Sequence, residues 1–452
     1  MGIAAALVML SFGLGAVTLA VGGEGTEMEL GRSGSSTGPP PAQRPDATIT
    51  HSPIRHVYAQ YPPATNVENS SHPLKFTHLV VDRNTGLVYA GAVNKLFQLD
   101  AGLRVEETAV TGPLKDSPEC HASGCDSPAI QTTLMDNVNK VLVIDPESRT
   151  LIACGSLKQG ACEKYRMANI SLQPDFIPTS IAANDEMAST YAFIGPEHYN
   201  PWGRSNVLYV GTTYTNNGEY RDDVPAISSR KLYNFEYAEL SFSKQSIVRI
   251  DVKYRDHFLV KYVYGFNASE FAYFVIVQKQ SPLPGQEELG YVSRLARTCI
   301  NDANYDSYTE VTLQCLVRDP TSPGSMVSYN LIQDAKVTEA GAELAMSLGI
   351  RTSDPVLVGV FGPSRGISNE PQPRSAMCVY SLQDIEAKFN ENIHMCFNGS
   401  IKYRNMDYIS GLILDGKCPM AGVSYQIVFF STICVTVNGP RSVASICDNR
   451  WT

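Results

Sequence analysis

A short serine-containing string in this chain has the spacing of a catalytic motif. Gly362, Ser364 and Gly366 form G-x-S-x-G, which in many hydrolases holds a nucleophilic serine on a sharp turn between a strand and a helix. Pro371 and Pro373 follow closely, and proline prevents a regular helix there. The string therefore lacks the helix that this chemistry needs. The chain also has no Gly-rich phosphate loop and no H-E-x-x-H string, so we expect no enzyme activity and no cofactor.

The cysteines could form disulfides. The chain has 11 cysteines, and two pairs are close together, Cys120 with Cys125 and Cys154 with Cys162. The eight histidines are scattered and no Cys/His group has zinc spacing, so a metal site is not expected. Four N-x-S/T sequons for N-glycosylation are present, at Asn69, Asn169, Asn267 and Asn398. Disulfides and sequons together favour an oxidising, secretory route.

The N-terminus supports that route. Residues 3–21 are apolar apart from Ser and Thr, and small residues near position 20 suit a signal peptidase. We expect a cleaved signal peptide over residues 1–22. A signal peptide usually begins with Lys or Arg, and this segment has neither. An uncleaved signal anchor that stays in the membrane is the alternative. The net charge of −9 does not suggest a nucleic-acid partner.

Composition divides the rest of the chain. Residues 23–72 are rich in Gly, Ser, Pro and Thr, which predicts a disordered linker. From residue 73 onward, short runs rich in β-branched and aromatic residues alternate with turn residues and predict an all-β fold. Two stretches, 337–349 and 381–393, have helical spacing instead, and the second begins with a Ser cap.

A weak internal repeat refines this fold class. An apolar strand followed by x-Tyr/Ala-x-Gly and a second strand occurs at LVYAGAV, TLIACGS, VLYVGTT and VLVGVFG. The first three copies lie about 60 residues apart, a period that suits the blades of a β-propeller. An ordinary large β-sandwich, which also repeats hairpins, is the alternative.

Four motifs in order then resemble one family. FTHLVVDRNTGLVYAGAVNKLFQLD (76–100), TGPLKDSPEC (111–120), DNVNKVLVID (136–145) and ACGSLKQGACEKYR (153–166) are similar to the Sema domain of plexins, the receptors for semaphorins. The resemblance implies a seven-bladed Sema-type propeller with short helical insertions. In this chain it covers about five blades, over residues 73–422.

The resemblance also implies disulfides beyond the two close pairs. It pairs Cys315 with Cys378 and Cys396 with Cys418. The usual partner of Cys299 lies elsewhere in plexins, and Cys434 stands here at a different spacing. We therefore expect Cys299 and Cys434 to be unpaired or uncertain.

The implied function is recognition of a semaphorin by protein–protein contact, in semaphorin–plexin signalling and axon guidance. The resemblance places such contacts in the third and fourth blades, near an aromatic and charged stretch, 214–242. The candidate contact residues are Tyr220, Arg221, Arg230 and Lys231. A solvated loop is the plainer interpretation of this stretch. The whole receptor would lie at the plasma membrane and could form homodimers or bind a co-receptor.

Other functions remain open. One alternative is a secreted semaphorin-like ligand, although CGSLKQGAC resembles plexins more than semaphorins. A soluble decoy is another, and a secreted propeller enzyme is a third. The sequence does not identify the plexin class or the cognate semaphorin.

The last 30 residues, 423–452, resemble nothing expected of the family at that point, and we interpret them as intron-derived, with the propeller cut short. Transcript reads should then splice out the codons after Gly422. A monodisperse secreted product of this chain that melts cooperatively and binds a semaphorin would contradict the interpretation.

Overall fold

The structure is a computed structural model that describes residues 17–21, 75–125, 127–197, 205–242, 244–319, 324–397, 406, 408–410, 435–436 and 445–446. The predicted linker (23–72), most of the leader (1–22) and most of the tail (423–452) lie outside these residues. So do Asn69, Asn398, Cys418 and Cys434. Among the described residues, no helix is long and apolar enough to cross a membrane.

The described chain folds into five sheets that follow one another along the sequence. The strands of the first two sheets are β2 (Phe76–Val81), β3 (Val88–Ala92), β4 (Lys95–Leu99) and β5 (Val105–Val110), then β8 (Asn139–Asp145), β9 (Thr150–Gly155), β10 (Cys162–Arg166) and β11 (Asp175–Ile177). Those of the third and fourth are β12 (Thr190–Pro196), β13 (Asn206–Thr212), β14 (Ile227–Lys231) and β15 (Ile247–Ile250), then β16 (Lys261–Ala268), β17 (Phe271–Lys279), β18 (Tyr291–Cys299) and β19 (Thr309–Thr312). The fifth sheet contains β22 (Leu331–Glu339), β23 (Pro355–Gly362) and β24 (Ser375–Ser381).

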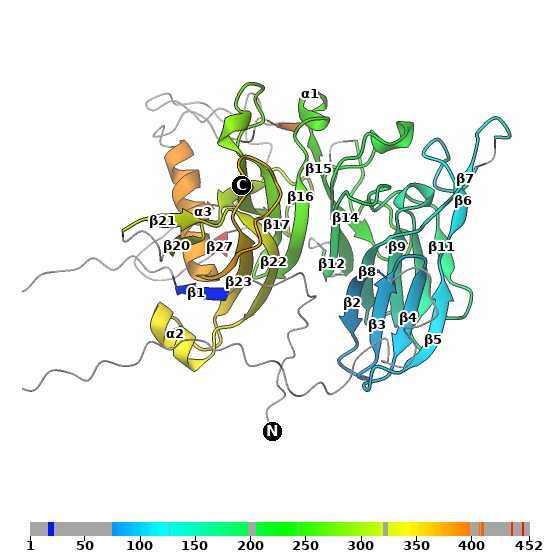
Figure 1. The fold of residues 1–452 in the computed structure, drawn as a ribbon, viewed down its shortest axis with the longest axis horizontal. Helices are drawn as coiled ribbons and strands as arrows, with labels where there is room; N and C mark the ends of the chain where they lie inside the picture. Colours follow the sequence, from blue (N-terminus) through cyan, green and yellow to red (C-terminus); the bar gives the residue numbers. More distant parts are fainter. Residues whose placement is uncertain are drawn as a thin grey trace, which may run out of the picture.

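These sheets are arranged as the blades of a propeller (Figure 1). Neighbouring strands within each run pair antiparallel, and the first strands β2, β8, β12, β16 and β22 lie next to one another in that order. An apolar cluster fills each junction between consecutive sheets, for example with Tyr89 and Leu142 at the first and Ile152 and Leu208 at the second. The predicted Sema-type propeller with about five blades is confirmed. A sandwich, which packs two sheets face to face, is excluded.

The repeated glycine has a structural role at two of these junctions. Gly91 on β3 faces Asn139 of the next sheet, and a Cβ there would lie only 2.3 Å from the Asn139 Oδ1. Gly211 on β13 faces Tyr262 of the fourth sheet, and a Cβ would lie 2.2 Å from its ring. A larger residue would therefore push the sheets apart, because the neighbouring side chain occupies the space a side chain would need.

Two edges receive strands from distant parts of the chain. β25 (Ile409–Ser410) pairs with β15 and extends the third sheet to five strands. β1 (Val17–Val21) pairs in parallel with β24 and occupies the fourth position of the fifth sheet. Short hairpins lie outside the five sheets: β6 (Leu114–Asp116) with β7 (Thr133–Met135), β20 (Leu316–Arg318) with β21 (Met326–Ser328), and β26 (Val435–Thr436) with β27 (Ser445–Ile446).

The described residues contain few helices, as expected. These helices are α1 (Val252–Arg255), α2 (Ala342–Leu348) and α3 (Leu382–Phe397), with the 3-10 turns η2 (Lys158–Gly160), η3 (Glu219–Arg221) and η4 (Glu287–Leu289). The predicted helix 337–349 is shorter than expected, because the β-branched Val337 and Thr338 pair with β23 instead. Ser381 caps α3 by accepting the Asp384 amide at 3.0 Å.

A buried arginine fixes α3 to the fourth sheet. The Arg297 guanidinium lies between two aromatic rings, 4.1 Å from the Phe271 centroid and 4.2 Å from that of Phe389 on α3. It also forms an ion pair with Glu386, whose second oxygen accepts the Tyr273 hydroxyl at 2.6 Å. The cation is thus both paired and stacked, which compensates for its burial.

One histidine at the first junction is held neutral. His78 on β2 pairs with Gly91, and its Nδ1 lies 3.2 Å from the Thr77 hydroxyl. Burial, together with the nearby Lys140 ammonium, lowers the pKa of His78 to about 4. Between this value and the unfolded pKa of 6.5, the unfolded chain binds a proton that the folded chain does not.

Folding stability should therefore fall as the pH drops from about 6.5 towards 4, by up to about 3 kcal/mol from His78 alone. We expect His78→Gln to flatten this part of the pH dependence, measured by urea unfolding at several pH values. An equal slope for the variant and the wild type would contradict the assignment.

Candidate protein-binding surface

The third sheet has two long connections between its strands. We call residues 213–226, 232–242 and 244–246 the third-sheet edge. The first connection joins β13 to β14 and includes η3, and the second joins β14 to β15. This region contains most of the stretch that the sequence marks as a candidate contact site.

A buried arginine anchors the first connection. Arg221 is 1% exposed, and its two Nη atoms donate to the Gln159 carbonyl at 2.9 Å and the Ala182 carbonyl at 3.0 Å. Burial lowers the pKa of Arg221 to about 10. Because its donors are directed inward to the second sheet, Arg221 positions the loop and is not a contact residue in this conformation.

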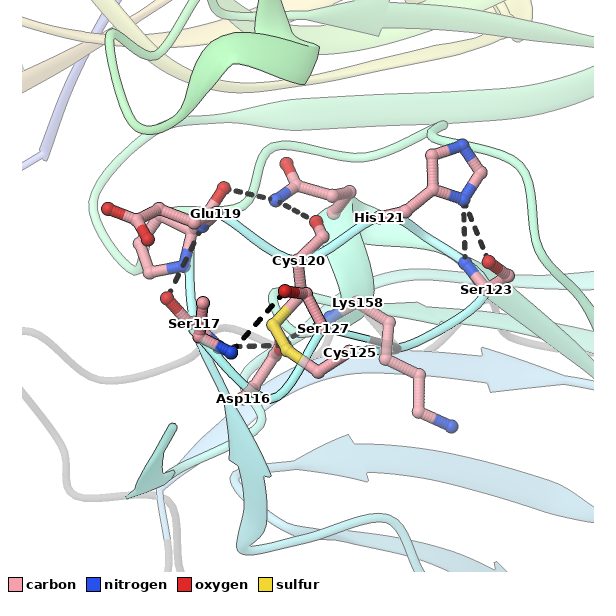
Figure 2. Close-up of a disulfide and its surroundings, with 12 residues drawn as sticks. Asp116, Ser117, Glu119, Cys120, His121, Ser123, Cys125, Ser127 and Lys158 are labelled. Atoms are coloured by element: carbon pink, nitrogen blue, oxygen red, sulfur yellow. Dashed lines mark hydrogen bonds between the residues drawn. A yellow bond between two sulfur atoms is a disulfide. The ribbon is translucent and has the colours of Figure 1, made fainter. Parts of the chain in front are cut away.

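The disulfide loop before β8 supports the same connection (Figure 2). Gln159 donates from Nε2 to the carbonyls of Pro118, at 2.7 Å, and Cys120, at 2.9 Å, across the Cys120–Cys125 bridge. The His121 ring meets that of Tyr220 edge-on, with centroids 5.2 Å apart. Tyr220 is half-exposed, and its ring packs against this loop.

Asp116, Cys120 and Cys125 are close enough together to suggest a metal site. However, the two cysteines are bonded to each other, so neither supplies a thiolate. The Asp116 carboxylate accepts the amides of Ser117 at 2.9 Å and Lys158 at 2.6 Å (Figure 2). This group is a loop anchor, not a metal centre.

Acidic side chains mark the outside of the first connection. Glu219, Asp222 and Asp223 are exposed. Asp222 pairs with Arg255 of α1 at 3.1 Å and accepts the Tyr214 hydroxyl at 3.0 Å. Burial and this hydrogen bond raise the pKa of Tyr214. The surface here is polar and mostly acidic.

A second buried arginine lies under the next connection. Arg230 on β14 donates to the Ser228 hydroxyl at 3.0 Å and the Phe235 carbonyl at 3.1 Å, and it lies 4.3 Å from the Tyr237 ring centroid. Burial lowers the pKa of Arg230. The structure thus separates two adjacent candidates, because Lys231 is half-exposed while Arg230 is enclosed.

The second connection exposes apolar side chains that the candidate set did not include. Leu240 bridges to Gln245, and the Ser241 amide donates to the Lys244 carbonyl at 2.8 Å, which closes a tight hairpin. The Gln245 amide donates to the Asn304 Oδ1 of the fourth sheet at 3.1 Å. Phe242 is fully exposed on this hairpin.

Leu240 and Tyr233 on the same edge are 61% and 71% exposed. A group of exposed apolar side chains rimmed by polar residues is typical of a protein contact site. In the sequence, an aromatic residue between serines in a polar turn was the signal that could have identified Phe242.

Ser364 does not sit in a catalytic arrangement. It lines an open cavity of about 320 Å³, and its hydroxyl accepts from Asn330 Nδ2 at 2.6 Å. An amide cannot take a proton from serine, so the observed neighbour is not a general base. Residues 365–374 contain no helix, as the prolines predict.

The structure contains three of the expected disulfides, Cys120–Cys125, Cys154–Cys162 and Cys315–Cys378. Cys154 and Cys162 face each other in the register of β9 and β10. Cys299 and Cys396 are also disulfide-bonded, so Cys299, which the sequence left as unpaired or uncertain, has a partner. The pairing of Cys396 with Cys418 stays a prediction.

Comparison with known proteins identifies relatives. The Sema domain family matches residues 332–423. Mouse Plexin-A4 is 33% identical over 345 residues, which is 72% of this chain and 17% of that protein. Human Plexin-A2 is 29% identical over 75% of this chain and 18% of its own length. The chain thus spans about a fifth of the length of the curated relatives it matches.

A solved structure extends this similarity to the fold. The full extracellular region of Plexin A4 has a TM-score of 0.63 and 30% identity, covering 77% of this chain and 38% of that one. The predicted relationship to the plexin Sema domain is therefore confirmed.

The two adjacent basic residues should respond differently to charge reversal. Arg230→Glu places an unpaired carboxylate among buried groups and should destabilise the fold by about 3 kcal/mol or more. Lys231→Glu should cost less than about 0.5 kcal/mol. Denaturant unfolding of both variants checks this, and equal losses would contradict the burial of Arg230.

Proposed function

We propose that the receptor to which this plexin-like Sema domain belongs binds a semaphorin by protein–protein contact through the third-sheet edge. The observation that carries the proposal is the exposed Phe242, with Leu240 and Tyr233 on the same connection. Burying these side chains against a partner would supply a hydrophobic centre, and the acidic residues of the first connection would form part of a polar rim.

Three considerations support this proposal. The relatives are plexins, and the family resemblance implies semaphorins as ligands with contacts in the third and fourth blades. The hydrogen bond from Gln245 to Asn304 links the exposed hairpin to the fourth sheet, so both blades contribute to one edge. Arg221 and Arg230 hold the two connections from inside, which reduces the entropy lost on binding.

The similarity to plexins also suggests where the site lies in the cell. We propose an extracellular or secretory location for this chain, in keeping with its disulfides. We also propose that the whole receptor acts at the plasma membrane in semaphorin–plexin signalling and axon guidance. Dimerisation or a co-receptor would belong to that receptor.

Phe242→Ser should weaken binding to a cognate semaphorin by about tenfold or more, since a central apolar anchor is lost. The melting temperature should not change, because the side chain is exposed. Surface plasmon resonance against a panel of semaphorin ectodomains measures the affinity. Met346→Ser is the matched control, as Met346 is an exposed apolar residue on α2 of the fifth sheet and should leave binding unchanged.

The outcomes separate the function from the site. No binding by the wild-type receptor ectodomain to any semaphorin would contradict the proposed function. Binding by the wild type that Phe242→Ser leaves intact would contradict only the third-sheet edge as the site.

A further inference from the structure

A turn after β10 lies at the seam between the first and second sheets. The Tyr89 hydroxyl donates to the Met167 carbonyl at 2.7 Å, and the Ile170 amide donates to Gln98 Oε1 at 3.3 Å. Ile170 is fully buried in the cluster of this junction. The sequon residue Asn169 is therefore fixed against the first sheet by Met167 and Ile170 on either side of it.

The side-chain amide of Asn169 has a defined orientation. Its Oδ1 accepts the Ser171 amide at 2.8 Å and the Ser171 hydroxyl at 2.6 Å. Its Nδ2 donates to Glu107 Oε1 on β5 at 3.1 Å. The nitrogen that would carry a sugar thus faces the outer strand of the first sheet.

That outer strand is an open edge. Among the described residues, β5 pairs with β4 on one side and with no strand on the other. Val105 and Val110, at its two ends, are 40% and 74% exposed. Unpaired strand edges with exposed apolar residues invite pairing with other chains, and proteins commonly cover or charge them.

We propose that Asn169 carries an N-glycan that covers the outer edge of β5. In the transfer, Nδ2 bonds to the anomeric carbon of a lipid-pyrophosphate-linked oligosaccharide, the bond from that carbon to the phosphate oxygen breaks, and the lipid pyrophosphate leaves with its electron pair. Nδ2 loses one proton and keeps the other. The retained proton can still donate to Glu107, and the sugar extends from Nδ2 beside the β5 edge.

The test uses the full chain expressed in animal cells. Glycopeptide mass spectrometry should find sugar on Asn169, and an unmodified Asn169 would overturn the proposal. The position of the sugar is then probed with Glu106→Cys, which places an exposed thiol on β5. We expect a bulky maleimide to react several-fold faster at this thiol when Asn169→Gln removes the glycan.

Two controls keep the result specific. Asn267→Gln removes an exposed sequon on β16 and should leave the Glu106→Cys rate unchanged. Lys336→Cys on β22 reports a distant exposed site, and its rate should not respond to Asn169→Gln. Equal rates at Glu106→Cys with and without the Asn169 glycan would show that the sugar does not cover β5 and would overturn the proposal.

Discussion

The close approach of neighbouring sheets is the constraint on which the rest of this structure depends. At Gly91 and Gly211 the absence of a side chain admits Asn139 and Tyr262 from the next sheet, so the blades pack without a gap. The apolar clusters between the sheets could not form at a larger separation, since dispersion contacts weaken steeply with distance. The glycine repeat is therefore needed for the propeller, because it lets neighbouring blades pack in contact.

Rigid junctions allow the loops to carry function. Buried arginines reach from the third sheet into its surroundings, where Arg221 binds carbonyls of the second sheet and Arg230 binds within its own. Neither guanidinium can contact a binding partner, because both are buried. The outer side of each connection stays accessible to such a partner. The exposed Phe242 is thus presented by a loop whose base is fixed.

The sequence could predict the features that depend on local pattern. Strand alternation, the glycine repeat and the close cysteine pair Cys154–Cys162 all follow from neighbours in the chain. It could not place Arg221, because the carbonyls that bind this residue belong to positions 159 and 182. The helix expected from residue 337 begins only at Ala342 for the same reason, since pairing of residues 337 and 338 with β23 outweighs a local propensity. Exposure of Phe242 likewise depends on a hairpin that sequence alone does not orient.

Hydrogen–deuterium exchange of the protein with and without a cognate semaphorin tests the central claim most directly. The account predicts slower exchange in peptides from the third-sheet edge, residues 213–226, 232–242 and 244–246, and in the adjoining loop that contains Asn304. Slower exchange confined to the fifth sheet or to the first, with the third-sheet edge unchanged, would contradict it.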